Sequence, residues 1–248
     1  MSYNPFSLNG KHILITGASS GIGKSIAIEC SKMGCSLMIT GRNEDRLLET
    51  FSELEGTGHK YLTANLDSED DLLRLADACS ALDGVVFNAG LGCSKPINFI
   101  KAEDLDDVYR TNLFSIVLLN RILLKKKLLK KGASLVFTSS LSAHLTGAGL
   151  AVYASSKAAV CGYMRTCALE LAAKGIRANA ILPGMVETKL INAGTYSADD
   201  RQGDMALYPL GRYGSPEDIA HPTIFLLSDA SSWMTGTEMI IDGGRSLK

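Results

Sequence analysis

The stretch His12-Ile-Leu-Ile-Thr16-Gly17-Ala-Ser-Ser-Gly21-Ile-Gly23 lies close to the start of the chain. Its first five residues form a short apolar run typical of a buried strand, and apolar residues with helical spacing follow from Ile22. The glycines between them let the backbone turn tightly, and a helix N-terminus offers free N–H groups and partial positive charge. The stretch predicts a phosphate-binding turn, with the spacing G-x-x-x-G-x-G in place of the common G-x-G-x-x-G.

Strand-like and helix-like patterns alternate along the whole chain. Besides 12–16, β-rich apolar runs occur at 36–40, 84–87, 134–138, 177–182 and 237–241, and longer stretches with helical spacing separate them. This alternation favours right-handed β-α-β crossovers. We therefore expect an α/β fold in one domain over 1–248, doubly wound around a mainly parallel sheet with helices on both faces.

The residues after the second predicted strand bear on which dinucleotide binds. They read Gly41-Arg42-Asn43-Glu44-Asp45, where an acidic residue directly after the strand would favour NAD through its ribose hydroxyls. Arg42 can instead form charge-assisted hydrogen bonds with a 2′-phosphate, which favours NADP(H) over NAD(H). The alternative is that Arg42 pairs with Glu44, Asp45 or solvent.

A second pattern predicts chemistry. Tyr153 and Lys157 are four residues apart in Tyr-Ala-Ser-Ser-Lys, and Ser140 lies upstream in Val-Phe-Thr-Ser-Ser. On a helix, positions i and i+4 share a face, so the Lys157 ammonium can lie beneath the Tyr153 phenol. Lowering a tyrosine pKa from about 10 to near neutrality takes roughly 4 kcal/mol, and a fixed cation can supply much of it.

Taken together, these motifs resemble those of the classical short-chain dehydrogenase/reductase family, over nearly the whole chain. The matching segments are the turn 16–23, Asn88-Ala89-Gly90, the set Asn112, Ser140, Tyr153 and Lys157, Pro183-Gly184 with Thr188, and Ile241-Asp242-Gly243-Gly244. In character the chain is most similar to 3-oxoacyl-acyl-carrier-protein reductases. The resemblance implies a Rossmann-type sheet of seven strands. It disfavours enoyl reductases, whose tyrosine and lysine are more widely separated.

The resemblance also implies residue roles. Tyr153 is then the general acid or base, Ser140 hydrogen-bonds the substrate oxygen, and Lys157 lowers the tyrosine pKa and holds the nicotinamide ribose. Asn112 fixes the water chain that replenishes the proton. The implied cofactor site comprises Gly17, Ser19, Ser20, Gly21, Ile22, Gly23, Arg42, Asn65, Leu66, Asn88, Ala89, Gly90, Tyr153, Lys157, Pro183, Gly184, Val186 and Thr188.

Three positions depart from the family pattern. Asn65 stands where many relatives carry Asp, and Phe87 where they often carry a second asparagine. Ser20 stands where NADP-preferring relatives often have a basic residue, which leaves Arg42 to carry the prediction of NADP.

The substrate is open to more than one reading. A 3-oxoacyl thioester or related ketone is expected, and the alternative is a polyol, sugar or other secondary alcohol. An alternative outside the enzymes is a catalytically silent sensor that binds NADP. Lys131 and Lys174 fall at positions where relatives that accept acyl carrier protein use basic residues, and an acidic carrier would be attracted to them. The alternative is a solvated helix end whose lysines complement the helix dipole.

Composition limits the remaining possibilities. The net charge of −1 and the pI near 6.4 do not suggest nucleic acid or a membrane surface, so a small-molecule partner is expected. Neither an export signal nor a transmembrane run is found, which indicates a cytoplasmic protein. Six scattered cysteines and four separated histidines predict reduced thiols and no metal site.

Two further expectations concern mobility and assembly. The polar, turn-rich segment 189–213 predicts a mobile substrate lid, since a connection this long inside a compact domain is usually functional. The family resemblance implies a homotetramer, and the small residues Ala158, Ala159 and Gly162 would permit close helix packing between subunits.

Overall fold

A computed structural model describes residues 3–188 and 198–247. The strands are β1 His12–Thr16, β2 Ser36–Gly41, β3 Lys60–Thr63, β4 Leu82–Phe87, β5 Leu129–Thr138, β6 Arg177–Pro183 and β7 Glu238–Ile241. The helices are α1 Gly21–Lys32, α2 Glu44–Ser52, α3 Glu69–Ala78, α4 Ala102–Tyr109, α5 Ser115–Lys125, α6 Ala151–Leu171, α7 Ala198–Met205 and α8 Pro216–Leu227.

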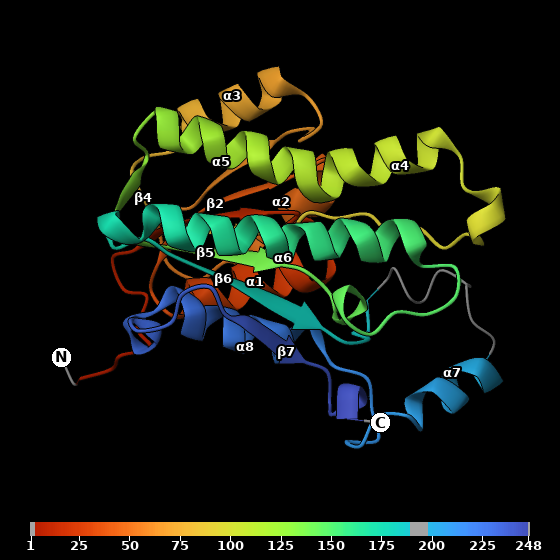
Figure 1. The fold of residues 1–248 in the computed structure, drawn as a ribbon. Coiled ribbons are helices and arrows are strands. Elements are labelled where there is room, and N and C mark those ends of the chain that lie inside the picture. Colours follow the sequence, from red (N-terminus) through yellow and green to blue (C-terminus); the bar gives the residue numbers. More distant parts are fainter. Residues whose placement is uncertain (1–2, 189–197, 248) are drawn as a thin grey trace.

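The seven strands form one sheet in the order β3-β2-β1-β4-β5-β6-β7, and every neighbouring pair is parallel (Figure 1). This confirms the predicted Rossmann-type, doubly wound α/β fold, and the sheet is entirely rather than mainly parallel. The chain moves outward from β1 to β3 and then crosses back to β4. Beside β1 and β4 the strand order therefore reverses, and such switch points place a crevice at the carboxyl ends of the strands.

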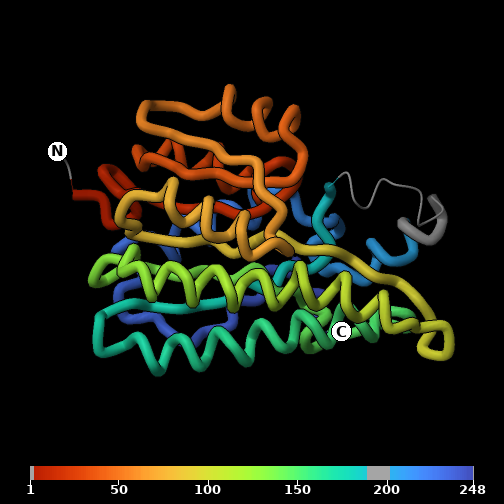
Figure 2. The backbone as a smooth tube through the Cα atoms, turned by 90° about the horizontal axis from the view of Figure 1, so that it is seen from above, coloured from red at the N-terminus to blue at the C-terminus, as the bar shows by residue number. Residues whose placement is uncertain are grey.

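Helices cover both faces of the sheet, and each face has its own hydrophobic core. One core joins the sheet to α3, α5 and α6, and the other joins it to α1, α2 and α8. Figure 2 shows the α4–α5 path running beside α6 over one face. The strands are apolar on both sides, as β1 illustrates with four buried residues in succession, because a parallel sheet between two helical layers has no solvated face.

One strand escapes the sequence pattern. β3 is an edge strand whose residues Lys60-Tyr-Leu-Thr63 are exposed or half-buried, so it lacks the apolar run that marks the other strands. The remaining strands lie where the runs predict them. β5 begins five residues earlier than predicted, at Leu129, because its first residues pair only with the start of β4.

The predicted lid 189–213 is only partly visible. Residues 189–197 lie outside the described part of the chain, so the lid itself stays a prediction. Beyond α7, two tyrosines anchor the segment to the rest of the protein. Tyr208 and Tyr213 are buried with their ring centroids 5.3 Å apart, and the Tyr208 hydroxyl accepts a hydrogen bond of 3.0 Å from the Met185 backbone. The sequence did not predict the burial of these two tyrosines, because the segment as a whole is polar.

Within 3–188 and 198–247, no helix is long and apolar enough to cross a membrane. The six cysteines of the described residues are unpaired, and four of them are buried. The described residues contain no group of His, Cys, Asp and Glu side chains that could hold a metal ion.

Candidate active site

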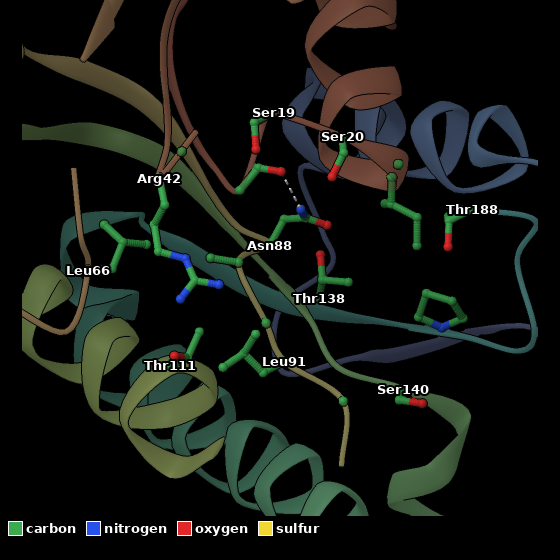
Figure 3. Close-up of a pocket in the computed structure, with 18 of the residues that line it drawn as sticks. Ser19, Ser20, Arg42, Leu66, Asn88, Leu91, Thr111, Thr138, Ser140 and Thr188 are labelled. Atoms are coloured by element: carbon green, nitrogen blue, oxygen red, sulfur yellow. Dashed lines mark hydrogen bonds between the residues drawn. The ribbon is translucent and has the colours of Figure 1, made fainter. Parts of the chain in front are cut away.

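A cavity of about 570 Å³ opens at the carboxyl ends of the strands, around the switch point. All of the expected cofactor residues line it except Gly23, and Ser140, Tyr153 and Lys157 line it as well. In Figure 3, Arg42 enters the cavity between Leu66 and Asn88, while Ser140 lies at the opposite end. The cavity therefore connects the predicted nucleotide end with the predicted catalytic end.

The glycine-rich turn is built for close approach of the backbone. Gly17 has φ +68°, and a Cβ there would lie 2.8 Å from the Ala89 Cα. A Cβ on Gly23 would lie 2.2 Å from the Gly17 carbonyl oxygen, which explains why Gly23 supports the turn from behind rather than lining the cavity. Side chains are excluded here by the packing of the turn itself.

The N-terminus of α1 faces this turn, and no acidic side chain of the helix neutralises it. Its N-cap Ser20 makes no side-chain capping bond, and the first turn of α1 contains no acidic residue. The first N–H groups of a helix lack intrahelical partners and carry partial positive charge. Together with the exclusion of side chains from the turn, this arrangement fits the pyrophosphate of a dinucleotide.

Thr16 joins the ends of β1 and β4 beneath the cavity. Its hydroxyl donates to the Val86 carbonyl oxygen at 3.3 Å and accepts from the backbone N–H groups of Asn88 and Ala89 at 3.0 and 3.2 Å. The Asn88 amide donates back to the carbonyl oxygens of Thr16 and Gly17. The Asn-Ala-Gly segment and the glycine turn are thus held as one unit.

At the catalytic end, the Lys157 ammonium is fixed from two sides. Lys157 is only 3% exposed, and its Nζ donates to the Thr138 carbonyl oxygen at 3.0 Å. It lies 5.8 Å from the centroid of the Tyr153 ring, as the i, i+4 spacing on α6 predicts. The Ser139 hydroxyl donates to the Lys157 carbonyl oxygen at 2.8 Å, which ties α6 to the end of β5.

The electrostatics differ from the sequence-based expectation. Burial raises the pKa of Tyr153 above its ordinary value, and the Ser140 hydroxyl offsets part of that rise. Burial also lowers the pKa of Lys157 to about 8. The predicted lowering of the Tyr153 pKa is therefore not seen in the protein alone, because desolvation outweighs the hydrogen bond with Ser140.

Asn112 lies in a π-helical turn, Arg110–Phe114, between α4 and α5. Such turns are rare and are frequent at functional sites. Its amide oxygen accepts from the Leu91 backbone N–H at 2.7 Å, while its amide nitrogen donates to the Leu91 carbonyl oxygen and to the Ser156 hydroxyl, both at 3.0 Å. Ser156 in turn donates to the Tyr153 carbonyl oxygen at 2.7 Å. Asn112 therefore lies behind the cavity wall.

Sequence reasoning missed several residues of the site. Leu91 and Ser156 act as partners of Asn112, and nothing in the sequence around either residue indicates that pairing. Arg46 also lines the cavity, at the same end as Arg42. Its position four residues after Arg42 was a usable signal, because α2 begins between them.

Comparison with known proteins agrees with this geometry. Residues 17–246 match the protein family described as enoyl-(acyl carrier protein) reductase. The chain is 33% identical over 237 residues to the 3-oxoacyl-(acyl-carrier-protein) reductase FabG of Rickettsia conorii, covering 96% of this chain and 97% of the relative. The chain belongs to the classical short-chain dehydrogenase/reductase family. The match spans the glycine turn, the Tyr153–Lys157 pair and the C-terminal signature alike.

Other members of this family that resemble the chain have different named activities. The glucose 1-dehydrogenase of Gluconobacter oxydans is 32% identical over 247 residues, covering 96% of this chain and 92% of the relative. A candidate 2-deoxy-D-gluconate 3-dehydrogenase from Agrobacterium tumefaciens, solved with bound NADP, superimposes with a TM-score of 0.89 at 30% identity. It covers 99% of this chain and 100% of its own. The chain is therefore a short-chain oxidoreductase of the type that uses NAD(P).

Proposed function

We propose that the protein reduces a ketone with NADPH, and that the ketone is a 3-oxoacyl thioester or a close relative. The observation that carries this proposal is the single cavity with Ser140, Tyr153 and Lys157 at one end and an arginine at the other. The similarity to FabG reductases supports the acyl substrate.

The raised pKa of Tyr153 suits the reducing direction. A carbonyl that accepts hydride becomes an alkoxide, which needs a proton from a group that is still protonated near neutral pH. When bound, NADPH supplies the hydride. Tyr153 donates its phenolic proton to the substrate oxygen, and Ser140 donates a hydrogen bond to the same oxygen. The Lys157 ammonium stabilises the resulting phenolate until solvent returns the proton.

Arg42 supports NADPH over NADH. No ion pair or side-chain hydrogen bond of Arg42 is found among the described residues, despite its acidic neighbours Glu44 and Asp45. An unpaired guanidinium that lines the cavity is available to a 2′-phosphate. The structural relative solved with NADP is consistent with this preference.

A carrier protein is part of the proposal, and the structure constrains how it would act. Lys131 and Lys174 are both exposed, and their neighbours Gly132 and Gly175 abut, so the two lysines belong to one patch. This patch lies at the C-terminal end of α6, whereas Tyr153 lies near its start; the 21 residues of α6 span about 30 Å. A carrier docked there would serve the site of a neighbouring subunit.

Such delivery requires an oligomer, and we propose a homotetramer. Support comes from the exposed face of α6, where Ala158 is exposed and Leu169 is 81% exposed. Light scattering coupled to size-exclusion chromatography tests the tetramer; a monodisperse monomer would contradict it.

A charge reversal tests the docking of a carrier protein. Changing both lysines, Lys131→Glu and Lys174→Glu, should raise KM for a carrier-bound thioester while leaving KM for a small thioester unchanged.

The second candidate function is oxidation of a sugar, polyol or other secondary alcohol. It is favoured by the likeness to the glucose 1-dehydrogenase. Initial rates separate the two: turnover of acetoacetyl thioesters with NADPH supports the reductase, whereas turnover only of sugars or polyols with NADP supports the dehydrogenase. A catalytically silent sensor would show neither activity, and its output would survive Tyr153→Phe. Location in the cytoplasm stays a prediction from the sequence.

A further inference from the structure

Two arginines, rather than one, line the end of the cavity beside β2. Arg42 follows β2 directly, and Arg46 is the third residue of α2. Both side chains are exposed, and both line the cavity, together with Asn43 between them. The preference for NADP proposed above rests on Arg42 alone, although Arg46 presents the same chemistry to the same space.

The backbone of Arg46 is well anchored. Its N–H donates to the Asn43 side chain at 2.9 Å, which caps the start of α2. Its carbonyl oxygen accepts from the Thr50 hydroxyl at 3.1 Å, and Thr50 is fully buried. The point from which the Arg46 side chain extends is therefore set by the fold, whereas its guanidinium is left free to reach a ligand.

Arg46 also has no anionic partner in the protein. Glu44, Asp45 and Glu49 lie on the same helix, yet in the described ranges none of them forms an ion pair with it. None of these three carboxylates lines the cavity. The guanidinium groups of Arg42 and Arg46 are thus two unneutralised cations at one end of the cavity, and an anion placed there is attracted by both.

The surroundings provide room for a phosphate. A Cβ on Gly41 would lie 2.9 Å from the Ser19 side chain, so glycine is needed for Ser19 to stand against the end of β2. The Ser19 hydroxyl has no hydrogen-bond partner in the described chain and lines the same cavity. A hydroxyl donor and two guanidinium groups match the acceptors of a dianionic phosphate.

We propose that Arg46 is a specificity-determining residue that binds the 2′-phosphate of NADP(H) together with Arg42. This inference rests on the proposed preference for NADP. It also accounts for Ser20 in place of a basic residue in the glycine turn, because the second cation comes from α2 instead.

Binding of cofactor fragments tests the proposal without catalysis. Calorimetry would measure binding of 2′,5′-ADP and 5′-AMP, which differ only by the 2′-phosphate, to the wild type, Arg42→Gln, Arg46→Gln and the double variant. Arg46→Gln should weaken binding of 2′,5′-ADP about tenfold and leave that of 5′-AMP within about twofold. Lys125→Gln, which removes an exposed cation from the C-terminal end of α5, outside the cavity lining, should change neither.

The outcomes separate the inference from the proposed function. If the wild type binds 2′,5′-ADP no tighter than 5′-AMP, the preference for NADP fails and the inference fails with it. If the wild type and Arg46→Gln discriminate equally while Arg42→Gln does not, only the role of Arg46 is overturned. If Arg46→Gln loses the same affinity for both fragments, the role of Arg46 is also overturned, because Arg46 would then contact a group that the two fragments share. Thermal unfolding of each variant checks that the fold is retained.

Discussion

The ammonium of Lys157 lies 5.8 Å from the centre of the Tyr153 ring, one helical turn along α6. Both groups are withdrawn from water, so burial shifts both towards their neutral forms: the pKa of Tyr153 rises and that of Lys157 falls to about 8. In the protein alone the pair is thus a protonated phenol next to a lysine that gives up its proton readily.

The lowered pKa of Lys157 makes stability depend on pH. Between about pH 8 and its ordinary pKa of 10.5, the unfolded chain binds more protons at this residue than the folded chain does. The free energy of unfolding of the wild type, relative to Lys157→Met, should therefore rise by about 3 kcal/mol across this window. Urea unfolding at several pH values measures the difference. Lys125→Met, at an exposed site, should show no such trend, and parallel curves for Lys157→Met would contradict the burial argument.

Two helical glycines should respond to alanine in opposite ways. Gly23→Ala places a Cβ 2.2 Å from the Gly17 carbonyl oxygen and 2.5 Å from the Asn88 amide nitrogen, so it should disrupt the turn and weaken dinucleotide binding by at least tenfold. Gly162→Ala on α6 meets no atom within 4 Å and should stabilise the monomer by about 0.5–1 kcal/mol. Chemical unfolding and fluorescence titration with NADPH measure both. Equal effects of the two substitutions would show that the turn tolerates a side chain.

Lys127 is the one non-glycine residue with positive φ, at +54°, among residues 3–188 and 198–247. It follows the C-cap of α5, where the left-handed conformation favours glycine. Lys127→Gly should raise the free energy of unfolding by about 1 kcal/mol, whereas Lys125→Gly, inside α5, should lower it by a similar amount. Thermal denaturation of both variants checks the sign, and destabilisation by Lys127→Gly would be the contrary result.

Asn112 should matter to stability as well as to turnover. Asn112→Ala removes both partners of the Leu91 backbone groups and should lower the free energy of unfolding by about 2–3 kcal/mol. Asn120 is the matched control, because it is equally buried but its amide oxygen has no hydrogen-bond partner. Asn120→Ala should therefore be the milder change. The reverse ranking in urea unfolding would show that the Leu91 bonds contribute little.

The sequence predicts those features that depend on residues close together in the chain. The glycine turn, the apolar strands and the Tyr153–Lys157 pair depend on residues a few positions apart, and the structure places them together. β3 was missed because an edge strand does not need an apolar run. The bonds from Asn112 to Leu91 span 21 positions and depend on a π-helical turn, which no short motif indicates.

Tertiary packing explains why the pKa of Tyr153 and the role of Arg46 differ from the sequence-based predictions. The pKa of Tyr153 was predicted from its neighbour on the helix, yet it is set mainly by the surrounding elements that exclude water. Arg46 was overlooked for a related reason: its spacing of four residues from Arg42 was a usable signal, but the placement of α2 beside the cavity is what brings both arginines to one site.

Initial rates with an acetoacetyl thioester, with NADPH and NADH in parallel, test the central claim most directly, for the wild type and for Tyr153→Phe. The account predicts turnover that prefers NADPH, and a loss of about a hundredfold or more in Tyr153→Phe with NADPH binding retained. Equal rates for the wild type and Tyr153→Phe would contradict the role of Tyr153. Turnover of alcohols alone would instead contradict the ketone substrate.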